Sequence, residues 1–240
     1  MKEKADNLQH AHDQILLLND FITKSVLNRY MAPDVVDDIL QGKIDMGATE
    51  KVTDITVLFA DLKNFTSICE DIGPAATAEM LNHYLTIMSE IIFEFGGTID
   101  KFIGDAIMVL FGAPKPMSKK EQINGAVTCA LAMQTSMPRI ITQHDTGYSP
   151  TDKKLALRVG IHHGPAIVGN FGSSQRSDYT AIGHTVNVAA HIETACRPGD
   201  AYVSEAVASE YRLNGGQAEQ NGVFKLKGIE EEAPLFRIVP

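Results

Sequence analysis

The stretch VTDITVLFADLKNFT, residues 52–66, carries the strongest structural signal of this chain. Residues 52–60 are rich in strand-forming side chains and end almost wholly apolar, which is typical of a strand buried in the middle of a sheet. Asp61 follows at once. A carboxylate at an apolar strand end is costly to bury unless it is hydrogen-bonded or binds a cation. Asp61 is therefore a candidate metal ligand, and capping the next helix is its simpler role.

A second stretch, DKFIGDAIMVLFG at residues 100–112, contains another candidate ligand. The short apolar runs 98–103 and 106–111 flank Gly104-Asp105, a pair that suits the two-residue loop of a hairpin. Asp105 could be a turn former alone. Two aspartates at the ends of elements can also converge on one hard, oxygen-seeking cation.

Helices and strands are mixed along the rest of the chain. Further helices are predicted at 75–95, 118–140, 184–196 and 205–212, and further strands at 155–162, 164–170, 201–204, 222–227 and 234–239. Ser118 and Glu121 have the spacing of a capping box at the start of one helix. The mixture, with its hairpins, predicts an α+β fold in which helices flank a mixed or antiparallel sheet.

The N-terminal region is predicted to form a helix over residues 1–29 that carries the seam of a coiled coil. Heptad positions a and d are occupied by Leu8, Ile15, Ile22, Ala11, Leu18 and Ser25. A single helix packed on its own domain is the alternative. A short helix at 33–41 and a polar linker follow, so residues 1–49 are expected to be a signalling helix with its linker and residues 50–240 a catalytic domain. A seam that begins at the first residues indicates a sensor domain upstream in a longer protein.

Composition excludes several classes of protein. The 240 residues include 21 Lys+Arg and 30 Asp+Glu, a net charge of −9, which argues against nucleic-acid binding. No aliphatic run is long enough to span a bilayer, and the first residues lack the apolar segment of a signal peptide. Three widely separated cysteines fit neither a disulfide framework nor a zinc cluster. A reducing, cytoplasmic location is expected. His162 and His163 lack a third metal ligand at suitable spacing.

Four strings carry a family resemblance. VLFADLKNFT, DKFIGDAIMVLFG, LRVGIHHGPAIVGNFGS and YTAIGHTVNVAAHIE begin at residues 57, 100, 157 and 179. Together, and in this order, they resemble the catalytic domain of class III nucleotide cyclases over residues 50–239. The match is most like bacterial and soluble-type adenylyl cyclases. The resemblance implies a ferredoxin-like cyclase core.

The resemblance also implies a metal site. Asp61 and Asp105 match the family's two metal-binding aspartates, and the backbone carbonyl of Leu62 is a further contact. Two divalent ions are expected, Mg²⁺ or Mn²⁺, with Ca²⁺ as a further candidate. Phe65 and Thr66 are expected beside the substrate, where the amides of residues 62–66 could hold phosphate oxygens at a helix N-terminus.

Base recognition is implied by a Lys/Thr pair. Lys101 matches the position that reads the purine, where lysine can donate to N1 of adenine; a guanine-selective member usually has Glu there. The partner position is Thr180, whose hydroxyl can accept from the exocyclic amine. Phe59 and Ile182 are expected to complete the substrate-binding set.

Ribose and phosphate contacts follow from the same resemblance. Asn187 matches the asparagine that orients the ribose. Arg158 and Lys227 match cations that bind the triphosphate and stabilise developing charge. Each could instead be an ordinary surface cation.

One position departs from the family. Four residues after Asn187 the family usually has an arginine that stabilises the transition state, and here it is His191. Histidine lacks the bidentate fork and is only partly charged at neutral pH. Either His191 is a weaker, pH-sensitive substitute, or Arg176 or Arg197 takes the role, or turnover is crippled while binding persists.

The chain carries both halves of the family's shared active site, the metal aspartates and the base-reading residues. This predicts a homodimer of head-to-tail catalytic domains with two equivalent sites. The expected reaction is ATP to 3′,5′-cyclic AMP and pyrophosphate. The alternatives are a guanylyl cyclase, less favoured because of Lys101, a diguanylate cyclase, whose signature turn is absent, and a non-enzymatic nucleotide-binding or dimerisation module.

Overall fold

The computed structural model describes residues 2–23, 33–43, 51–143, 155–173, 175, 177–225 and 232–239. The chain divides into two compact units, Met1–Asp45 and Met46–Pro240. Across the described ranges, no helix is both long and apolar enough to cross a membrane.

The N-terminal unit contains α1 (Lys2–Phe21) and α2 (Pro33–Leu40), as the sequence predicts. Helix α1 agrees with the prediction as far as the described residues reach, and residues 24–29 of the predicted helix lie outside them. The seam side chains of α1 are exposed to solvent in one chain, 72% for Leu8 and 58% each for Ile15 and Leu18.

Within the described ranges, the larger unit is built on one sheet of eight strands. In chain order these are β1 (Lys51–Lys63), β2 (Thr98–Ile103), β3 (Ala106–Phe111), β4 (Ala156–Gly172), β5 (Ser177–Ile182), β6 (Ala201–Ser204), β7 (Gln217–Phe224) and β8 (Ala233–Val239). They lie in the order β2-β3-β1-β4-β6-β8-β7, with β5 also paired to β4. The β4–β6 pair is parallel and the others are antiparallel, which confirms the predicted mixed sheet.

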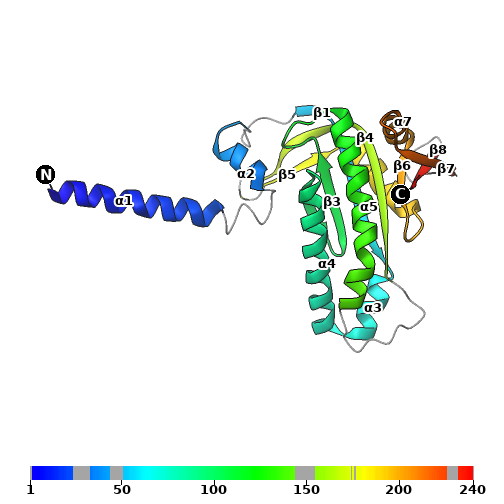
Figure 1. Ribbon diagram of the computed structural model, residues 1–240, viewed down its shortest axis with the longest axis horizontal. Helices are drawn as coiled ribbons and strands as arrows, with labels where there is room; N and C mark the ends of the chain where they lie inside the picture. Colours follow the sequence, from blue (N-terminus) through cyan, green and yellow to red (C-terminus); the bar gives the residue numbers. More distant parts are fainter. Residues whose placement is uncertain are drawn as a thin grey trace. The chain divides into compact units, whose positions relative to one another are not determined.

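Strand β1 is buried on both faces, as its apolar sequence predicts. Leu58, Ala60 and Leu62 belong to one core cluster, while Val57 and Phe59 belong to another, because successive side chains alternate across a strand. Helices α4 (Pro74–Glu94), α5 (Lys119–Gln143) and α7 (Glu205–Leu213) contribute to the first core, and α6 (His184–Ala195) covers the other face. Figure 1 shows α4 and α5 running side by side along the sheet.

The predicted break at residue 163 is wrong. Residues 155–162 and 164–170 were expected as two strands, but β4 is one strand of 17 residues. It pairs with β1 without interruption from Lys51↔Val168 to Lys63↔Ala156, and this long-range pairing overrides the local Gly-Pro signal. Pro165 lies where the second partner of β4 changes from β6 to β5.

Two other strands differ from prediction. Strand β5 was not expected from its polar sequence and forms by pairing with β4. Strand β7 begins at Gln217 rather than at residue 222, since a register shift between Gln220 and Gly222 lets it follow β8 past the glycine.

Two predicted local features are confirmed, a capping box and a hairpin loop. The amide of Ser118 donates to Glu121 Oε2 (2.8 Å) and the amide of Glu121 donates to Ser118 Oγ (3.3 Å), which is the reciprocal capping box at the start of α5. Strands β2 and β3 are joined by the predicted two-residue loop, and Gly104 has the positive φ, 66°, that such a turn requires.

Candidate functional site

The two candidate metal ligands come together where the β2–β3 turn meets β1. Strand β1 continues to Lys63, so Asp61 lies within it and not after its end. The backbone amide of Leu62 donates to Asp105 Oδ2 across 3.2 Å, which holds the hairpin turn against this part of β1. Burial, and then the negative charge of Asp61, raise the pKa of Asp105 to about 6. The two carboxylates are therefore close neighbours.

This carboxylate pair has the chemistry of a hard-cation site. Two partly buried negative groups repel each other, and a divalent ion would remove that cost. Among the described residues, no group of three or more His, Cys, Asp or Glu side chains could hold a metal ion. The chain therefore offers an oxygen pair, and the shell of a cation bound there would be completed by other oxygens.

Arg158 is engaged by carboxylates. It lies opposite Asp61 in the β1–β4 register, and its Nη2 contacts Asp61 Oδ2 and, at 3.0 Å, Glu193 Oε1. The second contact is an ion pair that is not aligned as a hydrogen bond. The sequence predicts a phosphate-binding role for Arg158, and the structure places it against Asp61, the candidate metal ligand.

Sequence reasoning missed Glu193. Burial raises its pKa to about 7, against the opposing effect of Arg158. Helix α6 brings Glu193 so close to β4 that a Cβ at Gly160 would lie 2.1 Å from the Glu193 amide nitrogen, which explains the glycine. The available signal was a carboxylate directly after Ile192 on the buried face of α6.

Tyr84 was also missed. Its side chain on α4 is 1% exposed, and its hydroxyl has no hydrogen-bond partner among the described residues. Burial and the charges of Asp105 and Asp61 raise the pKa of Tyr84 above its ordinary value. The hydroxyl is therefore a neutral donor near the carboxylate pair.

The predicted base-reading residues lie on neighbouring elements. Lys101 on β2 has a side chain that is 41% exposed, and Thr180 on β5 is 7% exposed. Asp100 is linked to both: its Oδ2 lies 3.2 Å from Lys101 Nζ, and the Thr180 side chain lowers the pKa of its carboxyl against the effect of burial. Ile182, at the end of β5, is 46% exposed.

Helix α6 presents the ribose and transition-state candidates. Asn187 and His191 are one turn apart, so they share one side of the helix. Asn187 is exposed and His191 is partly exposed, while Val188 and Ile192 are buried in the core.

The predicted phosphate cradle is partly wrong. Residues 62 and 63 belong to β1, and the Leu62 amide is used by Asp105. Helix α3 (Phe65–Ile72) begins only after Asn64, which has a left-handed backbone with φ 70°. Phe65 packs partly into the core and Thr66 is exposed.

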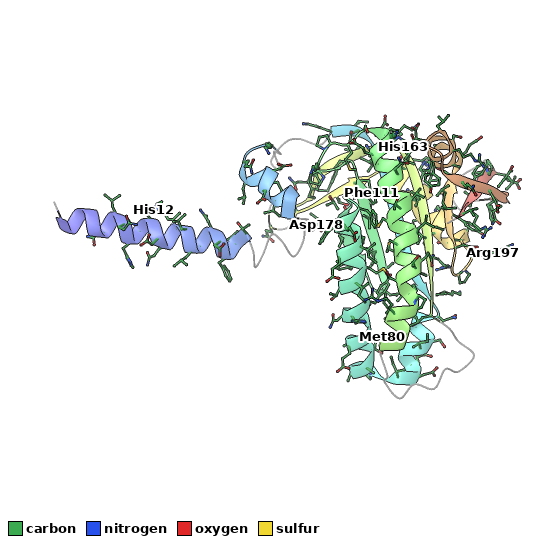
Figure 2. All side chains as sticks on the ribbon, in the orientation of Figure 1. His12, Met80, Phe111, His163, Asp178 and Arg197 are labelled. Atoms are coloured by element: carbon green, nitrogen blue, oxygen red, sulfur yellow. The ribbon has the colours of Figure 1, made fainter. Side chains whose placement is uncertain are left out.

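The remaining candidates are less informative. Lys227 and Arg176 lie outside the described residues. Arg197 is exposed in the loop after α6, at the edge of the unit opposite Asp178 in Figure 2. His162 Nδ1 contacts Ser204 Oγ (2.8 Å) and His163 Nδ1 contacts Thr56 Oγ1 (3.0 Å), so both histidines have structural partners.

Comparisons with known proteins identify the family of the larger unit. The profile of the adenylate and guanylate cyclase catalytic domain matches residues 48–238. An adenylate cyclase of Anabaena cylindrica is 31% identical over 201 residues, which are 80% of this chain and 37% of that protein. This chain therefore spans little more than a third of that relative.

Solved structures of nucleotide cyclases are also similar to this chain. The adenylyl cyclase CyaB from P. aeruginosa is 34% identical with a TM-score of 0.77, over 80% of this chain and 97% of that one. The guanylyl cyclase Cya2 is 31% identical with a TM-score of 0.70, over 80% of this chain and 94% of that one.

Proposed function

The chain belongs to the adenylate and guanylate cyclase catalytic domain family, and on that premise we propose that it is an adenylyl cyclase acting in the cytoplasm. It would convert ATP into 3′,5′-cyclic AMP and pyrophosphate. The observation that carries this choice is the gathering of Lys101 and Thr180 around one buried carboxylate. Lysine can donate to N1 of adenine, which is an acceptor, whereas N1 of guanine is itself a donor.

The reaction needs no covalent intermediate. The 3′-hydroxyl oxygen forms a bond to the α-phosphorus and its proton passes to water, while the bond from that phosphorus to the bridging oxygen breaks and pyrophosphate leaves with the electron pair. Asp61 and Asp105, with the Leu62 carbonyl, would hold divalent ions, which when bound acidify the hydroxyl and neutralise the triphosphate. Mg²⁺ or Mn²⁺ suits these oxygens, with Ca²⁺ as a further candidate.

Protein side chains would orient the substrate. Asn187 would fix the ribose, with Lys227 on the triphosphate. Arg158 contacts Asp61 in this structure, and its guanidinium would face phosphate oxygens when Asp61 holds a cation. His191 would supply one transition-state donor in place of the usual arginine.

Assembly is proposed to be a head-to-tail homodimer. The chain carries both the metal aspartates and the base-reading set, so two copies make two equivalent sites. In the N-terminal unit, the exposed a and d side chains of α1 would pair with those of a second copy. That pairing would link the catalytic domains to a sensor upstream in a longer protein.

Two alternatives have specific support. Guanylyl cyclases are among the relatives, and Cya2 is as similar in sequence as the Anabaena enzyme. A binding module without turnover is favoured only by His191. Lys101 counts against the first alternative, and the paired aspartates count against the second.

The test is cyclic nucleotide production by the purified chain with ATP and GTP in parallel, in Mg²⁺ and in Mn²⁺. Cyclic AMP from ATP alone, lost in Asp61→Ala, supports the proposal. Cyclic GMP as the main product would make the chain a guanylyl cyclase. ATP binding without any product would favour the binding module.

A further inference from the structure

Asp100 occupies an unusual backbone position. In the β2–β3 pair, Ile99 faces Val109 and Lys101 faces Met108, so Asp100 is the extra residue of a β-bulge. Neighbouring side chains of a regular strand point to opposite faces. The bulge instead brings Asp100 Oδ2 within 3.2 Å of Lys101 Nζ. Bulges re-aim side chains and are frequent beside active sites.

The Asp100 side chain is fully buried, with 0% exposure. Burial raises the pKa of its carboxyl, while Thr180, Lys101 and the Ala181 amide lower it. Among the described residues, neither carboxylate oxygen has a partner aligned for a hydrogen bond. Strands β2 and β5 are in contact, and the Thr180 side chain is near enough to lower the pKa of Asp100, so rotation can bring its hydroxyl hydrogen to the carboxylate. A buried carboxylate without aligned partners is costly, so its place between two base-reading residues calls for a reason.

The Thr180 hydroxyl has a single hydrogen, which it can donate to one acceptor only. An ionised carboxylate can only accept, so a hydroxyl that donates to it turns its lone pairs toward other groups. We propose that Asp100 is a positioning residue that makes the Thr180 hydroxyl an obligatory acceptor and thereby selects a purine with a 6-amino group. The proposal rests on the proposed function, because it takes Thr180 to face the base. Lys101, held by the same carboxylate, supplies the donor for N1.

The direct probe is a pair of nucleotides that differ only at position 6. Purine riboside triphosphate keeps the N1 acceptor of ATP and lacks its amine, so the Lys101 contact cancels in the comparison. Wild type should bind ATP about 5-fold or more tightly than the analogue, the size of one hydrogen bond. In Asp100→Asn the preference for ATP should fall to about 2-fold or less. The Asn amide can donate to the Thr180 oxygen, so the Thr180 hydroxyl hydrogen is free to point at the base.

A double-mutant cycle separates this role from a structural one. Thr180→Val should also lose the preference, and Asp100→Asn should change nothing further in that background. Asp54→Asn, an exposed aspartate on β1, is the matched control and should keep the wild-type preference. If Asp100→Asn fails to fold by thermal melting, Asp100→Ser removes the same charge.

Binding is measured by calorimetry with each nucleotide in Ca²⁺, and kcat/KM is measured in parallel. An equal preference for ATP over the analogue in wild type and Asp100→Asn would overturn the proposal. So would a further loss of that preference when Asp100→Asn is added to Thr180→Val. Absence of turnover in every protein would contradict the proposed function, while the binding ratio still decides the role of Asp100.

Discussion

The backbone amide of Leu62 donates to Asp105 Oδ2 across 3.2 Å, so the turn of a hairpin is bonded to the strand that carries Asp61. The bond joins positions 43 residues apart and puts two carboxylates together at partial burial. The pKa of Asp105 is about 6, above its ordinary 3.8. Its contribution to stability is therefore present below pH 4 and lost as the pH rises through 6. At neutral pH the ionised pair costs stability.

Replacing Asp105 should make the protein more stable and less active. Asp105→Asn removes the repulsion between the carboxylates, so without divalent ions at pH 7.5 the free energy of unfolding should rise by about 1–2 kcal/mol, discounted for partial exposure. The midpoint of thermal unfolding should rise by about 3–6 °C. Cyclic AMP formation should fall at least about 100-fold.

The control for this variant is Asp54→Asn, which removes an exposed carboxylate from β1 and should change neither quantity. A less stable Asp105→Asn protein would show that the carboxylate pair is not strained. EDTA should leave the midpoint of Asp105→Asn unchanged but lower that of wild type measured in Mn²⁺.

Restoring arginine at position 191 should accelerate the reaction. His191 is partly exposed on α6, one turn after Asn187, so a longer side chain has room there. We expect His191→Arg to raise kcat about 10- to 100-fold with little change in KM, the signature of a contact made in the transition state. The steady-state rate of cyclic AMP formation measures this. His12→Arg in α1 adds the same charge elsewhere, and equal rates in all three proteins would exclude His191 as the limiting group.

The α1 seam should control activity through dimerisation. Ile15 is a seam residue and Leu17 is not, yet both are exposed, 58% and 72%. Ile15→Asp should raise the dissociation constant of the dimer about 10-fold or more. When the protein is diluted, its activity per chain should therefore begin to fall at a higher concentration than that of wild type. Leu17→Asp should behave as wild type. Removal of residues 1–29 should match Ile15→Asp, and activity independent of dilution in all variants would contradict the coiled-coil prediction.

His162 should make the protein acid-sensitive. Burial, with the charges of His184 and His163, lowers its pKa to about 4 from 6.5. Between pH 6.5 and 4 the unfolded chain binds a proton that the folded protein does not, so folding loses about 2–3 kcal/mol over this window. In His162→Gln the free energy of unfolding should depend less on pH over this window than in wild type. Urea unfolding at several pH values measures this. Asp105 titrates with the opposite sign in both proteins and cancels in the difference. His12→Gln, on exposed α1, should keep the wild-type slope.

Much of the fold could be predicted from local sequence. The buried strand at β1, the Gly104-Asp105 hairpin loop and the Ser118-Glu121 capping box each depend on residues a few positions apart. Strand β5 could not be found this way, because its polar residues form a strand only against β4. Strand β4 continues through Pro165 for the same reason.

The candidate site, like the fold, could be predicted only in part. The candidate side chains could be identified without a structure, because Asp61, Asp105, Lys101, Thr180 and Asn187 stand in recognisable strings. Their partners became visible in the folded chain, where Arg158 contacts Asp61 and Glu193 and the Leu62 amide donates to Asp105. Propensity and periodicity act over a few residues, whereas the burial and the neighbours of a carboxylate depend on strand register and on helices distant in the chain.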